Sequence, residues 1–127
     1  GLSGRVQLHR TLLPRDPLPG RGYDGVVSNS LLHHLHDPMV LWRTVALAAR
    51  RGAPIFIADL ARPKDEAAID ALVAEMADEP VVLQHDFRAS LHAACTVDEV
   101  KTQLIEAGLD LAVEPLDGHH LVAWGHR

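Results

Sequence analysis

Three histidines, His33, His34 and His36, stand close together in the first third of the chain. A neutral imidazole accepts a proton near physiological pH, so a histidine beside a substrate can act as a general base. His33 and His36 share one face of a helix, a spacing that also suits two metal ligands. The sequence places no third ligand with them, and capping a helix or lining a crevice is the competing interpretation. We therefore take His33 and His34 as candidate catalytic residues and predict no metal site.

A strand-like segment, YDGVVSN at residues 23–29, leads into these histidines. Its apolar centre gives way to Ser28, Asn29 and Ser30, as in a buried strand whose carboxyl end reaches a ligand crevice. Hydroxyl and amide groups at that point can hydrogen-bond a bound molecule. The alternative is that the same residues cap the helical turn that follows.

Two further polar groups are candidates for contact with a substrate. Asp59 ends a second apolar run and can face an acceptor molecule, or it can be a turn residue paired with Arg62. Residues 85–90 form a polar cluster that we place before a helix, where it can line a pocket. Alternatively, Asp86 and Arg88 form a solvated ion pair of under ~1 kcal/mol. His119 and His120 are assigned to a hairpin turn, and Cys95 is expected to be a buried small residue.

The remaining pattern predicts the elements that position these residues. Asp37 followed by Pro38 indicates the start of a helix, Gly52 its end, and Thr96 with Glu99 the spacing of a capping box. Strand, helix and strand in succession predict a right-handed crossover in a parallel sheet. The expected strands are 6–9 (a weak one), 23–29, 53–60, 109–114 and 120–124, and the expected helical segments are 31–35, 39–50, 65–77 and 96–107.

The length and composition of the chain limit the classes of protein to which it can belong. The chain has 127 residues, enough for one domain but short for a complete cofactor-binding α/β enzyme. A net charge of −5 and the lack of a basic cluster disfavour nucleic acid. One cysteine forms no internal disulfide, no run approaches the ~20 apolar residues of a membrane span, and the N-terminus shows no signal-peptide layout. We expect a cytoplasmic protein without a membrane partner.

The order of elements and three local motifs resemble class I S-adenosylmethionine-dependent methyltransferases of the small-molecule type. The resemblance covers essentially all 127 residues and is strongest in YDGVVSNSLLHHLHDP, residues 23–38, which is similar to the family's fourth strand and following turn. Gly52 is similar to the glycine turn before its fifth strand. The terminal hairpin corresponds to the reversed last strand that separates this family from nucleotide-dependent dehydrogenases, a third candidate class that we set aside.

The family's upstream half has no counterpart here. No segment matches the first strand with its glycine-rich turn or the second strand with its ribose-binding acid, so we expect residues 1–127 to be a single partial methyltransferase domain, truncated at its N-terminus. The weak strand Val6–His9 looks like the family's third strand. Without the two central strands, an apolar edge is left open along Asp24–Asn29. We expect Val6–His9 to pair there directly and a second copy of the chain to cover what remains.

The resemblance implies an activity and a set of site residues. The expected fold is a Rossmann-like, mostly parallel α/β sheet with a C-terminal antiparallel hairpin. The expected function is methyl transfer from S-adenosylmethionine to a small-molecule acceptor in the full-length domain, with this chain alone inactive. The implied cofactor-binding residues are Ser28, Asn29, Ser30 and Leu31. The alternative is a non-catalytic remnant or interaction domain that keeps the fold without the cofactor.

Overall fold

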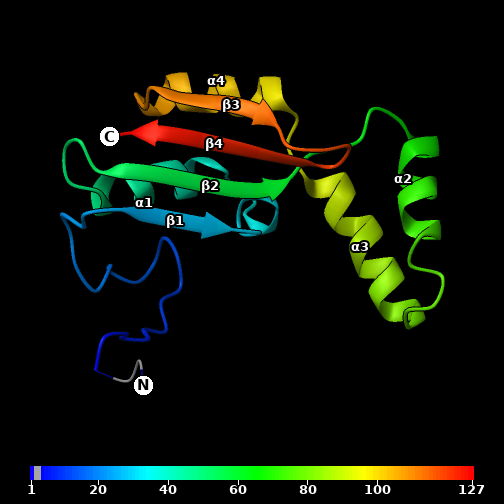
Figure 1. Ribbon diagram of the computed structural model, residues 1–127, viewed down its shortest axis with the longest axis horizontal. Helices are drawn as coiled ribbons and strands as arrows, with labels where there is room; N and C mark the ends of the chain where they lie inside the picture. The colour runs from blue at the N-terminus through cyan, green and yellow to red at the C-terminus, as the bar shows by residue number, and fades with distance from the viewer. Residues whose placement is uncertain (2–3) are drawn as a thin grey trace.

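A mixed four-stranded sheet forms the centre of the protein (Figure 1). The computed structural model describes residue 1 and residues 4–127. Strand β1 runs parallel to β2, while β4 runs antiparallel to both β2 and β3. The α/β Rossmann-like class and the closing hairpin are thus confirmed, and among the described residues the parallel part of the sheet is the β1–β2 pair. The strands are β1 (Val26–Asn29), β2 (Pro54–Leu60), β3 (Leu111–Pro115) and β4 (His120–His126), in the order β1-β2-β4-β3.

Two helices cover one face of this sheet. Helix α1 (Met39–Ala48) and helix α4 (Val97–Ala107) lie side by side behind the strands (Figure 1). The indole Nε1 of Trp42 donates to Oε1 of Gln103 at 2.9 Å, which ties α1 to α4. Gln103 also contacts Sγ of Cys95, which is half-buried rather than buried as expected. The core between sheet and helices contains Leu41, Trp42, Val45, Ile55, Ile57, Val100, Leu104, Val113, Leu121 and Ala123.

The other face of the sheet is apolar as well. The strand register aligns Val27 with Phe56, Phe56 with Trp124, and Trp124 with Ala112 in one row across all four strands. Val27 is 76% exposed, and Phe56 and Trp124 are each 46% exposed. We call this row the open face, because none of the described helices covers it (Figure 1).

Local signals determine where the helices begin and end. Thr96 and Glu99 form the predicted capping box at the start of α4, and Gly108 ends that helix with a left-handed φ of 67°. Asp65 caps α2 (Glu66–Ala74) by accepting from the backbone N–H of Ala68. The predicted capping box is confirmed, because it depends on neighbours within one helical turn. None of the described helices is long and apolar enough to cross a membrane.

A second pair of helices lies beyond the end of the sheet. Helix α3 (Val81–Ala93) packs with α2 around a small cluster that includes Ile69 and Leu91 (Figure 1). The polar residues 85–90 were expected before a helix, which is wrong, since they lie within α3. The suggested Asp86–Arg88 pair is also wrong. Arg88 instead bridges Glu66 and Asp70 on α2, because the two helices bring these charges together.

The N-terminal segment differs from expectation. Residues 6–9 form no strand, and the side chains of Val6 and Leu8 are 51% and 93% exposed. The expected strand Val6–His9 and its direct pairing with the edge of β1 are therefore wrong. Two alternating apolar residues bury too little surface to order a strand, and the prolines that follow direct the chain into a loop. Strand β1 lies at an edge of the sheet in the described structure.

Candidate functional site

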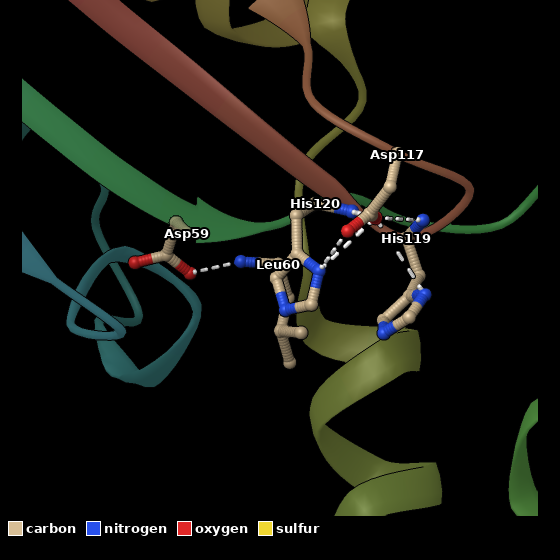
Figure 2. Close-up of polar contacts among 5 residues, drawn as sticks. All are labelled: Asp59, Leu60, Asp117, His119 and His120. Carbon is tan, nitrogen blue, oxygen red and sulfur yellow. Dashed lines mark hydrogen bonds and ion pairs between the residues drawn. The ribbon is translucent and has the colours of Figure 1, made fainter.

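Asp59 anchors the carboxyl ends of the two parallel strands. It lies near the end of β2 and is only 2% exposed. Its Oδ2 accepts the backbone N–H groups of Leu31 at 2.8 Å and Leu32 at 2.7 Å. Its Oδ1 accepts the N–H of Leu60 at 2.9 Å, a bond visible in Figure 2. A buried carboxylate is stable only when such donors replace water, so the start of the turn after β1 is held by the end of β2.

Both sequence interpretations of Asp59 are wrong. The carboxylate points into the protein toward residues 31–33, not toward an acceptor, and Arg62 pairs with Glu99 instead. The reason is topological. Parallel strands end at the same edge of a sheet, so a side chain at the end of β2 meets the loop that leaves β1. The sequence indicated a functional position here, because an acidic residue ends a buried strand. It did not indicate the partner of Asp59, because that depends on which strands pair in the sheet.

The imidazole of His33 completes this arrangement. Its Nδ1 lies 2.6 Å from Oδ1 of Asp59, and its side chain is 5% exposed. An ionised carboxylate only accepts, so the network assigns the proton of the neutral ring to Nδ1. Nε2 then carries the free lone pair. Nε2 has no hydrogen-bond partner among the described residues, and none of their buried polar side-chain atoms lacks one, so Nε2 reaches solvent.

His34 and His36 have different surroundings. The 3-10 turn η1 (Leu32–His34) places the rings of His33 and His34 with centroids 4.0 Å apart. His34 and His36 are both exposed. Of the two candidate catalytic residues, His33 is fixed by Asp59 and His34 faces solvent.

The candidate cofactor residues occupy the end of β1. Ser28 is half-buried on the helix-covered side of the sheet, whereas Asn29 and Ser30 are exposed. The backbone of Ser30 has a φ of 54°, and its N–H donates to the carbonyl of Ala58 at 3.0 Å. A serine in the left-handed region is uncommon, and it persists here because hydrogen bonds on both sides hold it.

Both backbone polar groups of Leu31 are hydrogen-bonded within the protein. Its backbone N–H donates to Asp59, and its carbonyl accepts from the N–H of His34 at 3.1 Å. Its half-buried side chain packs against the core. Any contact of Leu31 with a ligand therefore uses this side chain, while Asn29 and Ser30 retain exposed polar groups.

Solved structures share this fold. A possible exported protein from Bordetella parapertussis matches with a TM-score of 0.67 and 23% identity, over 99% of this chain and 46% of its own. A SAM-dependent methyltransferase from Aquifex aeolicus matches with a TM-score of 0.62 and 16% identity, over 94% and 53%. A provisionally assigned methyltransferase from Bacillus halodurans matches with a TM-score of 0.52 and 18% identity, over 77% and 40%.

The comparisons establish the fold at a coarse level. The chain has the fold found in the S-adenosylmethionine-dependent methyltransferase from Aquifex aeolicus. It spans about half the length of the structures it matches. No family model and no curated protein matches the sequence.

Proposed function

We propose that this chain belongs to an S-adenosylmethionine-dependent methyltransferase and that it contributes one side of the site where a small-molecule acceptor is methylated. The observation that carries the proposal is the Asp59 network, which holds the carboxyl end of β1 and the His33 imidazole in one rigid unit. Ligands of open α/β sheets gather at this edge of the strands. The shared fold adds support, because two of the solved structures are described as methyltransferases.

The end of β1 fits one part of the cofactor. Backbone and side-chain polar groups of Ser28, Asn29 and Ser30 would hydrogen-bond its methionine portion, with the Leu31 side chain beside them. The strained backbone at Ser30 supports this assignment, since such conformations cluster at ligand sites. When bound, S-adenosylmethionine would supply a methyl group to the acceptor atom: the new bond to the methyl carbon forms as the carbon–sulfur bond breaks, and S-adenosylhomocysteine leaves.

His33 is the better candidate for the general base. In this proposal, Nε2 of His33 takes the proton of the acceptor hydroxyl or amine, while Asp59 keeps the ring in the correct tautomer and stabilises the imidazolium that forms. Asp59 is then a positioning residue. His34, which contacts the His33 ring, would line the acceptor side.

A remnant without cofactor binding is the second candidate. Among the described residues, no strand is followed by a glycine-rich turn that leads into a helix, the arrangement that holds a nucleotide in folds of this kind. We propose that the activity belongs to the full-length domain and that residues 1–127 alone bind the cofactor weakly. A cytoplasmic location belongs to the same proposal and rests on the single Cys95.

Calorimetric titration distinguishes the two candidates. S-adenosylmethionine and S-adenosylhomocysteine are titrated into the 127-residue chain and into the product of the complete reading frame. We expect binding by the complete product and little heat with the 127 residues. If neither sample binds the cofactor, the methyltransferase proposal is contradicted. Micromolar binding by the 127 residues alone would exclude the remnant.

Variants of the complete product then test the site. Asn29→Ala is expected to weaken cofactor binding, and unchanged affinity would remove Asn29 from the site. Gln84→Ala on α3 is the control, because the Gln84 side chain bonds only the backbone of the preceding loop.

A further inference from the structure

A second cluster of chemically active side chains lies in the turn between β3 and β4. It consists of Asp117, His119 and His120, whose potential ligand atoms all lie within 4.8 Å of one another. Nδ1 of His120 is 2.9 Å from Oδ2 of Asp117, and Nδ1 of His119 is 3.7 Å from Oδ1. Figure 2 shows both imidazole rings on the same side of the carboxylate, above α3. Three potential metal-ligating side chains therefore lie together.

The backbone of this turn is held from three directions. Oδ1 of Asp117 accepts the N–H groups of His119 at 2.9 Å and His120 at 2.8 Å. The carbonyl of His119 accepts from Ala61 at 2.8 Å, and the carbonyl of His120 accepts from Leu116 at 3.0 Å. The three side chains thus lie on a turn that is hydrogen-bonded to the residues that follow β2 and β3. Little chain entropy remains to be lost when an ion binds.

The cluster is accessible to solvent. The side chains of Asp117, His119 and His120 are 47%, 26% and 39% exposed. Water therefore has access to the remaining coordination positions. Oδ2 of Asp117 accepts no backbone N–H; its partner is Nδ1 of His120 at 2.9 Å, and an ion bound between these two atoms would displace the proton they share.

We propose that Asp117, His119 and His120 form a binding site for a divalent first-row transition metal, with Zn²⁺ as a fitting occupant. Two imidazoles and one carboxylate are ligands that Zn²⁺ accepts in tetrahedral geometry, with water as the fourth. Bond lengths of about 2.0–2.1 Å require ligand atoms about 3.3 Å apart, and the potential ligand atoms here lie within 4.8 Å of one another before any ring rotates. The site is independent of the proposed methyl transfer.

The site has a defined place on the sheet. Leu60 pairs with His120 and Asp59 pairs with Leu121, so the metal would lie at the same edge of the sheet as the Asp59 network (Figure 2). The ring of His119 also packs edge-on against Phe87 of α3, with centroids 6.2 Å apart. A bound ion would therefore lie within the turn of the hairpin, at this edge of the sheet and beside α3.

Metal titration of the untagged chain tests the proposal. The protein is first treated with a chelator, then titrated with ZnCl₂ by calorimetry and with CoCl₂ by visible absorption. We expect one saturable site per chain. His119→Ala and His120→Ala should each weaken binding at least tenfold, while His9→Ala, in the N-terminal segment, should not change it. Equal affinity in the wild type and in a His119→Ala, His120→Ala double variant would overturn the proposal.

Two further measurements separate ligand binding from a purely structural role of the turn. Asp117→Asn retains a carbonyl oxygen for both backbone N–H groups but removes the negative charge, so it should preserve the fold and still weaken Zn²⁺ binding at least tenfold. Nuclear magnetic resonance of the wild type needs no variant. Zn²⁺ should shift the imidazole signals of His119 and His120 selectively, and shifts confined to other histidines would contradict the assignment.

Discussion

The carboxylate of Asp59 and the imidazole of His33 lie 2.6 Å apart, although 25 residues separate them in the sequence. This contact joins the end of β2 to the turn after β1. It also leaves one ring nitrogen of His33 facing solvent. The same carboxylate that holds the turn in place therefore determines which atom of His33 is available for proton transfer.

Removal of the Asp59 carboxylate should be strongly destabilising. Asp59→Ala leaves the buried N–H groups of Leu31 and Leu32 without an acceptor, and we expect the free energy of unfolding to fall by about 3 kcal/mol or more. Urea denaturation followed by circular dichroism measures this. Asp98→Ala is the control, because Asp98 is exposed and its pair with Lys101 contributes little. Similar losses in both variants would contradict the role of Asp59.

Stability should depend on the ionisation of Glu99. The backbone N–H of Thr96, followed by the guanidinium of Arg62, lowers the pKa of Glu99 below its ordinary value of 4.5. A carboxyl whose pKa is lower in the folded state contributes its full stabilisation above the unfolded pKa. That contribution is lost as the pH falls below 4.5 and through the folded value. Glu99→Gln should therefore be less stable than the wild type at pH 7, and the difference between their urea midpoints should shrink as the pH falls below 4.5.

A left-handed backbone explains the glycine after α4. Gly108 has a φ of 67°, and a Cβ built there meets no other atom within 4 Å. Gly108→Ala should therefore reduce stability by about 1–2 kcal/mol through backbone strain alone. Gly118→Ala is the matched control, since that glycine has the same open space without a left-handed φ. The difference between their thermal unfolding midpoints checks the prediction.

A second copy of the chain should cover the open edge of β1. Val27 is 76% exposed at this edge and begins the open face. We expect light scattering to give the mass of two chains, and Val27→Lys to give a monomer, because lysine on an edge strand opposes pairing. Val81→Lys, at an equally exposed position on α3, should remain a dimer. A wild-type monomer with strongly protected amides at residues 24–29 would contradict this prediction.

Local features of the fold could be predicted from the sequence. The capping box at Thr96 and Glu99 depends on contacts within one turn, so the spacing of the two residues was enough to predict it. The predicted strand at Val6–His9 was wrong, because an alternating apolar pattern does not by itself supply a neighbouring strand to pair with. Helix α3 was missed because Val81, Val82 and Leu83 are consecutive, exposed apolar residues and do not follow a helical period.

The site could be predicted only in part. Residues 28–34 were located from the polar end of an apolar segment. The network around Asp59 was not, because it depends on the parallel register of β1 and β2. His119 and His120 were predicted only to lie in a hairpin turn. Their approach to Asp117 could not be predicted, because it depends on the geometry of the folded hairpin.

The open face gives the protein an internal optical reporter. The chain has two tryptophans: Trp42 of α1 is completely buried in the core, and Trp124 is 46% exposed in the open face. A soluble quencher such as acrylamide should reach Trp124 and spare Trp42. Any polypeptide that covers the sheet would protect Trp124 while the buried indole serves as the reference signal. Covering of this surface can therefore be followed by fluorescence in the unmodified protein.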